Sequence, residues 1–474
     1  MKKVLFFVFL LFFANVIFSQ SVALDPAFGE DGITLVPNFE EILLFDLDKS
    51  GNIIAAGQSF GDTVGFLPLT LVKTNVNGVI DKNFGTNGIV KVMEFRKGNP
   101  IALKITNNNK IFVVCNFDNT LTDYRTTMIQ FNADGSFDDS FGENGKISIG
   151  FKSEPVVNIE SSDFILISDN FVHSTISKYN YLGEIDESFG KNGKVTMTDS
   201  VTYNIRPLCI KILRDQSIIV AGFDALNKCD TEIACCKLDA NGNFITDFAN
   251  NGIWKKNMCV DYDLFYETFC DVIEESNGDI VFTGKEFGAF ICKLNSDGVL
   301  YQNFGVDGFF YNYDFNGDKP KILPFEKKYF AGIMFGSYYG SYFLFSINQD
   351  GTLDTSFNNT GFFILDNIHV SDIKLQEANK IILGGDSKIL RLNISTGNSI
   401  RDNEVFFDTQ FIFPNPTKDN LYFKNKTKYE ILDIQGRVLQ KSENAEKSAN
   451  ISQIKAGIYF IKFDNNKVKK FVKE

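Results

Sequence analysis

Five aspartates occupy the same position of a short phrase that returns seven times along the chain. They are Asp25, Asp81, Asp138, Asp186 and Asp354, each three residues before a phenylalanine. Carboxylates serve as general acids and bases and bind cations, so the series suggests catalysis. A group that recurs around a ring of repeated units, however, serves the units that carry it rather than one site. We therefore interpret these aspartates as turn caps that accept backbone N–H bonds; Ile245 and Tyr301 replace them in two phrases.

Metal-binding patterns are weak in this chain. The string DLDKSGN, which contains Asp46 and Asp48, resembles the start of a Ca²⁺ loop, but Gly57 stands where an EF-hand loop needs a bidentate Glu. We interpret the string as a polar turn between two strands. The chain has 2 histidines, His173 and His369, which leaves little room for His-based metal or triad chemistry. We expect no metal site and no cofactor.

Two segments that depart from the repeat are rich in aromatic residues, which are the candidates for ligand binding. The first contains Trp254, Tyr262, Phe265 and Tyr266, and the second contains Tyr338, Tyr339 and Tyr342. Exposed aromatic rings beside scattered carboxylates can stack on sugar rings or on peptide side chains. The alternative is that these rings belong to strands and pack in the core.

Seven of the 8 cysteines lie between residues 209 and 292. We expect four of them, Cys209, Cys236, Cys270 and Cys292, to be small buried apolar residues, because they align with apolar strand positions. An exported protein can form disulfides, and Cys229 with Cys259 is the favoured pair if one forms. Zinc is not indicated, since no CxxC pair occurs.

The phrase itself is the main evidence for the fold. It begins as LDPAFGEDG and returns at periods of 48 to 59 residues, a length typical of one supersecondary unit stacked on its neighbours. We expect each Phe to be an apolar wedge between units and each final Gly to need a positive φ. These residues are Phe28, Gly32, Phe84, Gly88, Phe141, Gly145, Phe189, Gly193, Phe248, Gly252, Phe304, Gly308, Phe357 and Gly361.

Each unit contains four short apolar runs, as in GIVKVMEF, IALKIT, KIFVVCNF and TTMIQFN of the second unit. Four antiparallel strands per unit predict the blade of a β-propeller, and we place the strand that follows the phrase innermost. Seven units predict seven blades. We expect the N-terminal segment to pair near Ile389 to Leu392 and to complete the last blade, because closure protects the sheet edges.

The phrase resembles the D-x-S-F-G-x-x-G signature of the delta-sixty repeat, a bacterial β-propeller-like family of uncharacterised function. The resemblance covers about residues 21 to 400, with Ala249 and Asn358 departing at the first Gly of the signature. The single Trp of the chain argues against WD-type and kelch propellers, which carry recurrent Trp. The resemblance implies the fold and leaves the activity open.

The N-terminal residues are typical of a secretory signal. Two lysines precede an apolar run from Val4 to Ala14, and Ser19 lies near a plausible cleavage point. The run is shorter than the roughly 20 apolar residues of a membrane-spanning helix, so we expect no transmembrane segment. The formal net charge of −12 argues against nucleic-acid binding, which needs clustered Lys and Arg.

From about Asp402 the pattern changes to short strands that predict a small β-sandwich. Its motif residues are Pro414, Asn415, Pro416, Asp433, Gly436, Arg437, Gly457 and Tyr459. They resemble the type A C-terminal sorting domain of type IX secretion. The resemblance implies recognition by the outer-membrane secretion machinery, followed by release or by attachment to surface lipopolysaccharide. The alternative is an ordinary C-terminal adhesion sandwich.

The expected organisation is a signal peptide (1–20), an all-β, seven-bladed β-propeller (21–400), a linker (401–411) and a sorting domain (412–474). We expect a monomeric, non-enzymatic binding, adhesion or structural module, secreted or attached to the outer-membrane surface, with a glycan or protein partner. The alternative is a secreted carbohydrate-active hydrolase or lyase, which would need two unrepeated carboxylates in one cleft. We can choose no such pair, and we name no catalytic residue. A third hypothesis is a purely structural role in an outer coat.

Overall fold

The computed structural model describes residues 20–61, 65–94, 96–118, 124–150, 155–159, 164–169, 174–180, 182–199, 203–227, 230–257, 268–285, 288–312, 318–335, 340–366, 368–377, 379–396, 412–413, 419–433, 437–463 and 468–473. Apart from one 3-10 turn, η1 (Phe357–Asn359), every regular element among them is a strand. The chain divides into two compact units, residues 1–398 and 399–474. The all-β prediction is confirmed.

The described residues of the larger unit form seven sheets. The first three are β3 (Phe39–Leu47), β4 (Ile53–Ser59), β5 (Leu69–Thr74) and β6 (Ile89–Val92); β7 (Lys97–Ile105), β8 (Ile111–Asp118), β9 (Tyr124–Phe131) and β10 (Lys146–Ser148); and β11 (Val157–Ile159), β12 (Phe164–Asp169), β13 (Thr175–Asn180) and β14 (Lys194–Thr196). The next two are β15 (Ile205–Ile212), β16 (Ile218–Asn227), β17 (Asp230–Leu238) and β18 (Ile253–Asn257); and β19 (Thr268–Glu274), β20 (Ile280–Lys285), β21 (Ala289–Leu294) and β22 (Phe309–Asn312).

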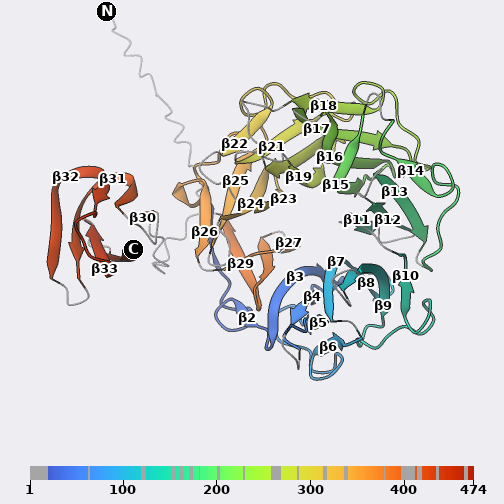
Figure 1. Cartoon of the computed structure of the whole chain (residues 1–474), viewed down its shortest axis with the longest axis horizontal. Coiled ribbons are helices and arrows are strands. Elements are labelled where there is room, and N and C mark those ends of the chain that lie inside the picture. Colours follow the sequence, from blue (N-terminus) through green and yellow to red (C-terminus); the bar gives the residue numbers. More distant parts are fainter. Residues whose placement is uncertain are drawn as a thin grey trace, which may run out of the picture. The chain divides into compact units, whose positions relative to one another are not determined.

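The sixth sheet is β23 (Asp318–Phe325), β24 (Lys328–Phe335), β25 (Ser341–Asn348) and β26 (Phe362–Asp366). The seventh is β27 (Asp372–Glu377), β28 (Lys380–Gly385) and β29 (Lys388–Thr396), joined by β1 (Gln20–Leu24) and β2 (Ile33–Leu35). The sheets follow one another around a ring, from β3 to β29 (Figure 1). The repeated four-stranded sheet is therefore the building block of this unit.

The strand that follows the repeated phrase is the last strand of its sheet. In the first sheet β6 pairs with β5, the strand just before the phrase, with Leu71 opposite Val90. The sequence interpretation, which made this strand the innermost one of the next unit, was wrong by one strand. The reason is that the phrase turns the chain back on itself: the Asp81 backbone N–H donates to the Lys73 carbonyl at 2.9 Å.

The apolar core lies between the sheets. Seven hydrophobic clusters each join two neighbouring sheets, and one of them joins the seventh sheet to the first. In that cluster Ile382 and Ile389 pack with Phe28, Phe45 and Val72. Because strand side chains alternate between two faces, each sheet buries one face against each neighbour.

The N-terminal segment pairs with the last strand of the ring. Leu24 lies opposite Leu392, and Ile33 lies opposite Leu390. The leading segment thus lies beside the strand that carries Ile389 to Leu392, where the sequence analysis expects it. The two ends of the ring unit are joined by an antiparallel ladder, so β29 is paired on both sides and is not an open edge.

Arg391 is the buried centre of this closure. Its Nε donates to Asp25 Oδ2 at 2.7 Å, and its Nη1 donates to the Val76 carbonyl at 2.7 Å. The guanidinium also lies over the Phe28 ring, with Cζ 4.8 Å from the centroid. Since Asp25 belongs to the N-terminal segment and Val76 to the first sheet, one side chain connects the N-terminal segment, the seventh sheet and the first sheet.

Asp46 makes a second connection across three sheets. From β3 its carboxylate accepts bonds from Lys374 of the seventh sheet at 3.0 Å and from the Ile105 backbone N–H of the second sheet at 2.9 Å. Lys104 lies at 3.4 Å. Burial alone would raise the pKa of Asp46, but the charges of Lys374 and Lys104 and the hydrogen bonds together lower it below 3.8.

The smaller unit is one sheet around a long strand. β31 (Asn420–Leu432) pairs with β30 (Ile412–Phe413), β32 (Val438–Asn450) and β33 (Gly457–Phe463), and β34 (Val468–Lys473) pairs with β33. Its core includes Leu421, Ile431, Ile461 and Phe471, all fully buried. In the described part of both units, no helix is long and apolar enough to cross a membrane.

Arg391→Met should destabilise the ring unit by about 3–5 kcal/mol, because it leaves the buried Asp25 carboxylate without its partner. The matched control is Lys73→Met at the equivalent position of the first sheet, whose pair with Asp81 is 3.6 Å long with side chains 20% and 32% exposed. That change should cost about 1 kcal/mol or less. Urea unfolding measures both, and equal losses would contradict the assignment of Arg391 as the closing residue.

Asp46→Asn should destabilise the protein near neutral pH and have a smaller effect in acid. A carboxylate whose pKa is lowered on folding contributes stability above its unfolded pKa, and that stability is lost as the pH falls through the folded value. The difference in unfolding free energy between the two proteins should therefore shrink as the pH falls below 3.8. A difference that stays constant with pH would contradict this role.

Candidate functional site

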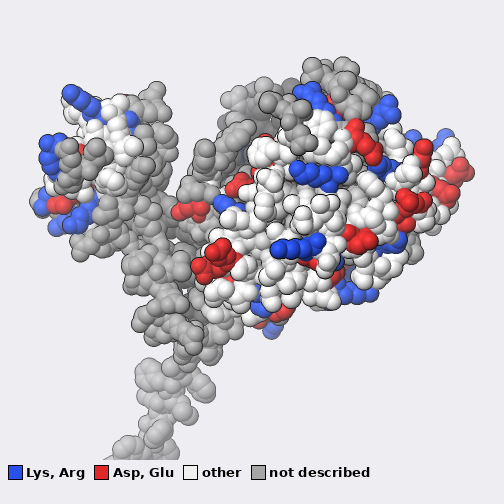
Figure 2. Space-filling view, turned by 90° about the horizontal axis from the view of Figure 1, so that it is seen from below, with Lys and Arg blue, Asp and Glu red and all other residues white. Residues whose placement is uncertain are grey.

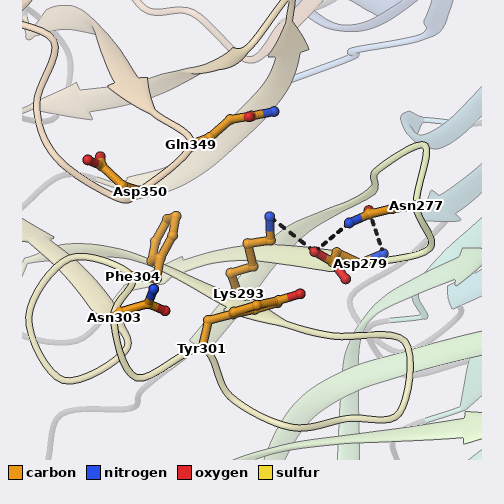
Figure 3. A pocket seen from close by; sticks show the side chains of 8 residues that line it. All are labelled: Asn277, Asp279, Lys293, Tyr301, Asn303, Phe304, Gln349 and Asp350. Atoms are coloured by element: carbon orange, nitrogen blue, oxygen red, sulfur yellow. Dashed lines mark hydrogen bonds and ion pairs between the residues drawn. The ribbon is translucent and has the colours of Figure 1, made fainter.

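A cavity of about 380 Å³ lies at the junction of the fifth and sixth sheets. Eight side chains line it, and we call it the junction cavity: Asn277, Asp279, Lys293, Tyr301, Asn303, Phe304, Gln349 and Asp350 (Figure 3). Its volume falls near the lower end of the range of about 300–1,000 Å³ that is typical of ligand sites.

Four segments position these residues. Asn277 and Asp279 belong to the turn between β19 and β20, and Lys293 lies on β21. Tyr301 to Phe304 form part of the fifth sheet's phrase, which connects β21 to β22. Gln349 and Asp350 come from the neighbouring sheet, in the turn after β25. The cavity therefore lies where a phrase of one sheet meets a turn of the next.

Lys293 lies at the centre of the polar contacts. Its Nζ is 2.6 Å from Glu275 Oε2 and 3.1 Å from Asp279 Oδ2, and it lies 5.1 Å from the centroid of the Tyr301 ring. In Figure 3 the lysine amine points into the space below Gln349. Glu275 in turn accepts a 2.5 Å hydrogen bond from the Tyr329 hydroxyl of the sixth sheet.

The charges of this cluster stabilise one another. Burial alone would lower the pKa of Lys293, but hydrogen bonds to Glu275 and Asp279 and their charges raise it. Burial and the Asp279 carboxylate raise the pKa of Tyr301, and burial and Glu275 raise that of Tyr329. At neutral pH Lys293 is therefore protonated, and the phenols of Tyr301 and Tyr329 are neutral.

The other sheets show why a cavity forms here. In the first, third and seventh sheets the basic residue that corresponds to Lys293 pairs with the phrase aspartate and also donates to a turn carbonyl of the next sheet. The pairs are Lys73 with Asp81 and Ala133, Lys178 with Asp186 and Ala240, and Arg391 with Asp25 and Val76. In the fifth sheet Tyr301 replaces the aspartate, and among the described residues Lys293 makes no bond to the next turn. The space that the bridge fills in those three sheets is left open here.

Every described sheet nevertheless keeps a cation paired with a carboxylate. In the second and sixth sheets the corresponding positions are Gln130 and Ser346, and Lys110 and Lys328 pair with the phrase aspartates instead, at 2.9 and 2.5 Å. In the fourth sheet, where Ile245 replaces the aspartate, Lys237 pairs with Asp215 at 3.6 Å. Acidic and basic side chains are accordingly interspersed on the face of the ring unit in Figure 2.

The phrase aspartates act as turn caps. Asp138 Oδ1 accepts bonds from the Ser140 backbone N–H at 3.2 Å and from its hydroxyl at 2.7 Å, and Asp25, Asp81, Asp186 and Asp354 accept the corresponding backbone N–H. The phrase phenylalanines are at most 2% exposed. The seven phrase glycines have φ values from 79° to 93°. The DLDKSGN string is also a turn, in which Asp48 accepts the Ser50 and Asn52 backbone N–H groups.

The aromatic residues predicted to bind ligand do not form a surface site in the described residues. Trp254 is 9% exposed and packs with Phe290 and Phe309, and Tyr342 is 2% exposed and packs with Phe330. This corrects the prediction for these two residues, because they lie on strands whose faces are buried against the next sheet. Tyr262, Phe265, Tyr266, Tyr338 and Tyr339 lie outside the described residues.

Five cysteines are buried free thiols: Cys115, Cys209, Cys235, Cys236 and Cys292. Burial raises the pKa of Cys236 to about 12, which keeps it a neutral thiol. The disulfide candidates Cys229 and Cys259 lie outside the described residues. Among the described residues, no group of three or more His, Cys, Asp and Glu side chains is placed to hold a metal ion.

Two of the predicted sorting-motif residues close a hairpin. Asp433 accepts bonds from the Arg437 backbone N–H at 3.0 Å and from its Nε at 2.6 Å, between β31 and β32. Gly457 begins β33, and the Tyr459 ring packs on Phe471 at 5.7 Å. Pro414, Asn415, Pro416 and Gly436 lie outside the described residues.

Sequence reasoning missed the junction cavity as a site. It recognised Tyr301 as a departure from the phrase aspartate but assigned no site to it. The signal that could have found the cavity is the coincidence of Tyr301 with two extra carboxylates, Glu275 and Asp279, in the same unit. Placing Gln349 beside them requires the contact between neighbouring sheets, which only the structure supplies.

Comparisons with known proteins identify the C-terminal unit. Residues 411–474 match the family of secretion system C-terminal sorting domains, which confirms that part of the sequence interpretation. A comparison with curated proteins found no match. The resemblance to the delta-sixty repeat stays a prediction.

Several solved structures are similar in fold to the chain at low identity. PorZ, a surface component of the type IX secretion system of Porphyromonas gingivalis, is 11% identical over 92% of this chain and 59% of its own, with a TM-score of 0.39, so this chain spans about three-fifths of PorZ. The β-propeller domain of the Trilobed protease from Pyrococcus furiosus is 10% identical over 76% of this chain and 99% of its own, with a TM-score of 0.39. The Dos1 propeller is 8% identical over 76% and 95%, with a TM-score of 0.45.

Tyr342→Phe should leave stability unchanged or raise it by about 1 kcal/mol, because the buried Tyr342 hydroxyl has no hydrogen-bond partner among the described residues. The matched control is Tyr329→Phe, which removes a hydroxyl that donates to Glu275. That change should cost about 1.5–3 kcal/mol, the range for bonds to charged groups. Thermal unfolding measures both variants, and a larger loss for Tyr342→Phe would contradict the prediction.

Proposed function

We propose that this chain is an exported, non-enzymatic β-propeller of seven blades that binds a glycan or a protein at the bacterial surface or in the medium. The observation that carries the export step is the sorting-domain match of residues 411–474, which implies type IX secretion to the cell surface or beyond. In this proposal the smaller unit is the sorting signal that directs export, and the ring unit is the exported domain.

The ring unit supports a binding role through its rigidity. Apolar clusters join each sheet to both neighbours, and Arg391 ties the N-terminal segment to the seventh and first sheets. A closed ring of this kind holds the turns at its sheet junctions in fixed positions. A ligand can then bind without the entropy cost of ordering those turns. The junction cavity provides one concave, polar surface of suitable size.

The chemistry of the cavity favours binding over catalysis. Asp279 and Glu275 both pair with Lys293, and Glu275 also accepts a hydrogen bond from the Tyr329 hydroxyl, so both carboxyl groups are engaged within the protein. Retaining and inverting glycosidases need one carboxyl group that donates a proton. The alternative of a secreted carbohydrate-active hydrolase or lyase therefore has no observation in its favour at this site, and an outer-coat role remains a separate hypothesis.

A chain truncated after Asn398, at the boundary between the two compact units, should remain inside the cell envelope. The full chain should reach the surface or the medium of a bacterium with type IX secretion, because the removed segment carries the sorting domain. Fractionation with an antibody to the ring unit measures the distribution. The full-length variant Tyr301→Ala is the control and should be exported. Export of the truncated chain would contradict the role of the C-terminal unit as the sorting signal.

The binding role is tested by incubating the full chain with glycan arrays and matrix-protein arrays, and by assaying hydrolysis of the same polymers. Binding without turnover supports the proposal. Turnover that one carboxylate substitution abolishes would establish the enzymatic alternative instead. Absence of binding on both arrays would refute the binding role and leave the export step standing.

A further inference from the structure

We propose that the junction cavity binds a neutral sugar residue through its hydroxyl groups. The inference rests on the proposed binding function and adds the site and the class of ligand. It is carried by the eight lining side chains, by the contacts that some of them already make, and by comparison with the corresponding junctions of the other sheets.

The first step is that the carboxylates of the cavity are already engaged. Asp279 Oδ2 accepts bonds from Lys293 and, at 2.8 Å, from Asn277 Nδ2. Asp350 Oδ1 accepts the Thr352 backbone N–H at 3.0 Å and the Thr352 hydroxyl at 2.6 Å. These carboxylate oxygens are therefore already hydrogen-bonded within the protein, and we do not assign them as the main ligands of a cation.

The second step is to identify the groups that remain available. The amides of Asn303 and Gln349 are exposed and make no hydrogen bond with other described side chains or backbone. An ammonium has three donors, and Lys293 uses one each on Glu275 and Asp279, so its third N–H is left for a ligand. Amides both donate and accept, and adjacent hydroxyl groups of a sugar do the same.

The third step concerns charge. Glu275, Asp279 and Asp350 outnumber Lys293, so an anionic ligand meets a net negative site. A cationic ligand would lie beside the ammonium of Lys293, which already pairs with the Glu275 and Asp279 carboxylates. A neutral ligand avoids both penalties, and the rings of Tyr301 and Phe304 give it apolar contact.

The fifth junction differs from the other junctions in its polar residues. In the first, third and seventh sheets a bridge from the basic residue to the next turn carbonyl fills the corresponding space. The fourth sheet resembles the fifth in having no phrase aspartate, because Ile245 replaces it. It differs in that Lys237 pairs with one carboxylate, Asp215, and no tyrosine stands at the phrase position. Tyr301 and the Glu275–Asp279 pair are together what distinguishes the fifth.

The experiment measures binding of methyl glucoside, methyl mannoside and methyl galactoside to the full chain by saturation-transfer NMR and calorimetry. D-glucuronate and D-glucosamine are the acidic and basic counterparts. At least one neutral glycoside should bind with a dissociation constant of about 1 mM or lower, and more tightly than both charged sugars. Tighter binding of either charged sugar, or no binding of any neutral glycoside, would overturn the inference.

Tyr301→Asp places the repeat's own aspartate in the fifth sheet and should draw Lys293 across the cavity, weakening binding at least about tenfold. The matched control is Ile245→Asp, the same restoration in the fourth sheet, which should leave affinity unchanged. Urea unfolding shows whether each variant is folded. The double variant Asn303→Ala and Gln349→Ala changes only exposed amides and should also weaken binding about tenfold.

The outcomes separate the two proposals. If arrays detect a ligand whose affinity is unchanged in Tyr301→Asp and in the double amide variant, the binding function stands and the cavity is not its site. If Ile245→Asp weakens binding as much as Tyr301→Asp, the effect is structural and the inference fails. Loss confined to Tyr301→Asp and the amide variant supports the cavity.

Discussion

The ring depends on one contact that recurs between neighbouring sheets. The phenylalanine of each phrase is buried against the next sheet, and a side chain at Gly78, Gly135 or Gly351 of the next turn would collide with it. Beside that contact, the residue after the phenylalanine donates its backbone N–H to the same turn, as from Gly305 to the Asp350 carbonyl at 2.7 Å. Apolar burial and a satisfied backbone donor thus fix each sheet on the next.

This contact explains why so much of the fold could be predicted. A recurring Phe and a recurring Gly are visible in a single sequence, and their physical requirements, burial and positive φ, are local. The pairing of the leading segment near Leu392 followed from counting the units. The strand order was shifted by one because apolar runs on both sides of the phrase look alike, and only the Asp81 to Lys73 backbone bond shows that the phrase is a hairpin connection.

The polar contacts between sheets were less predictable. A cation and a carboxylate meet in every sheet that the structure describes, yet the lysine moves between the third strand, as in Lys73, and the start of the second, as in Lys110. Because the lysine occupies different positions in different units, no motif along the chain marks it. The aromatic candidates failed for a related reason: Trp254 and Tyr342 interrupt the repeat in sequence but occupy ordinary buried strand positions.

The fifth sheet shows that the polar contacts of a junction can change while the fold is kept. The Phe304 and Gly351 contact and the Gly305 bond are retained there, so the junction is held by the same apolar and backbone interactions as its neighbours. Only the polar bridge is changed, since Glu275 and Asp279 hold Lys293 within its own sheet. Because the Phe304 contact and the Gly305 bond remain, the polar bridge of this junction can differ without removing the contacts that hold the two sheets together.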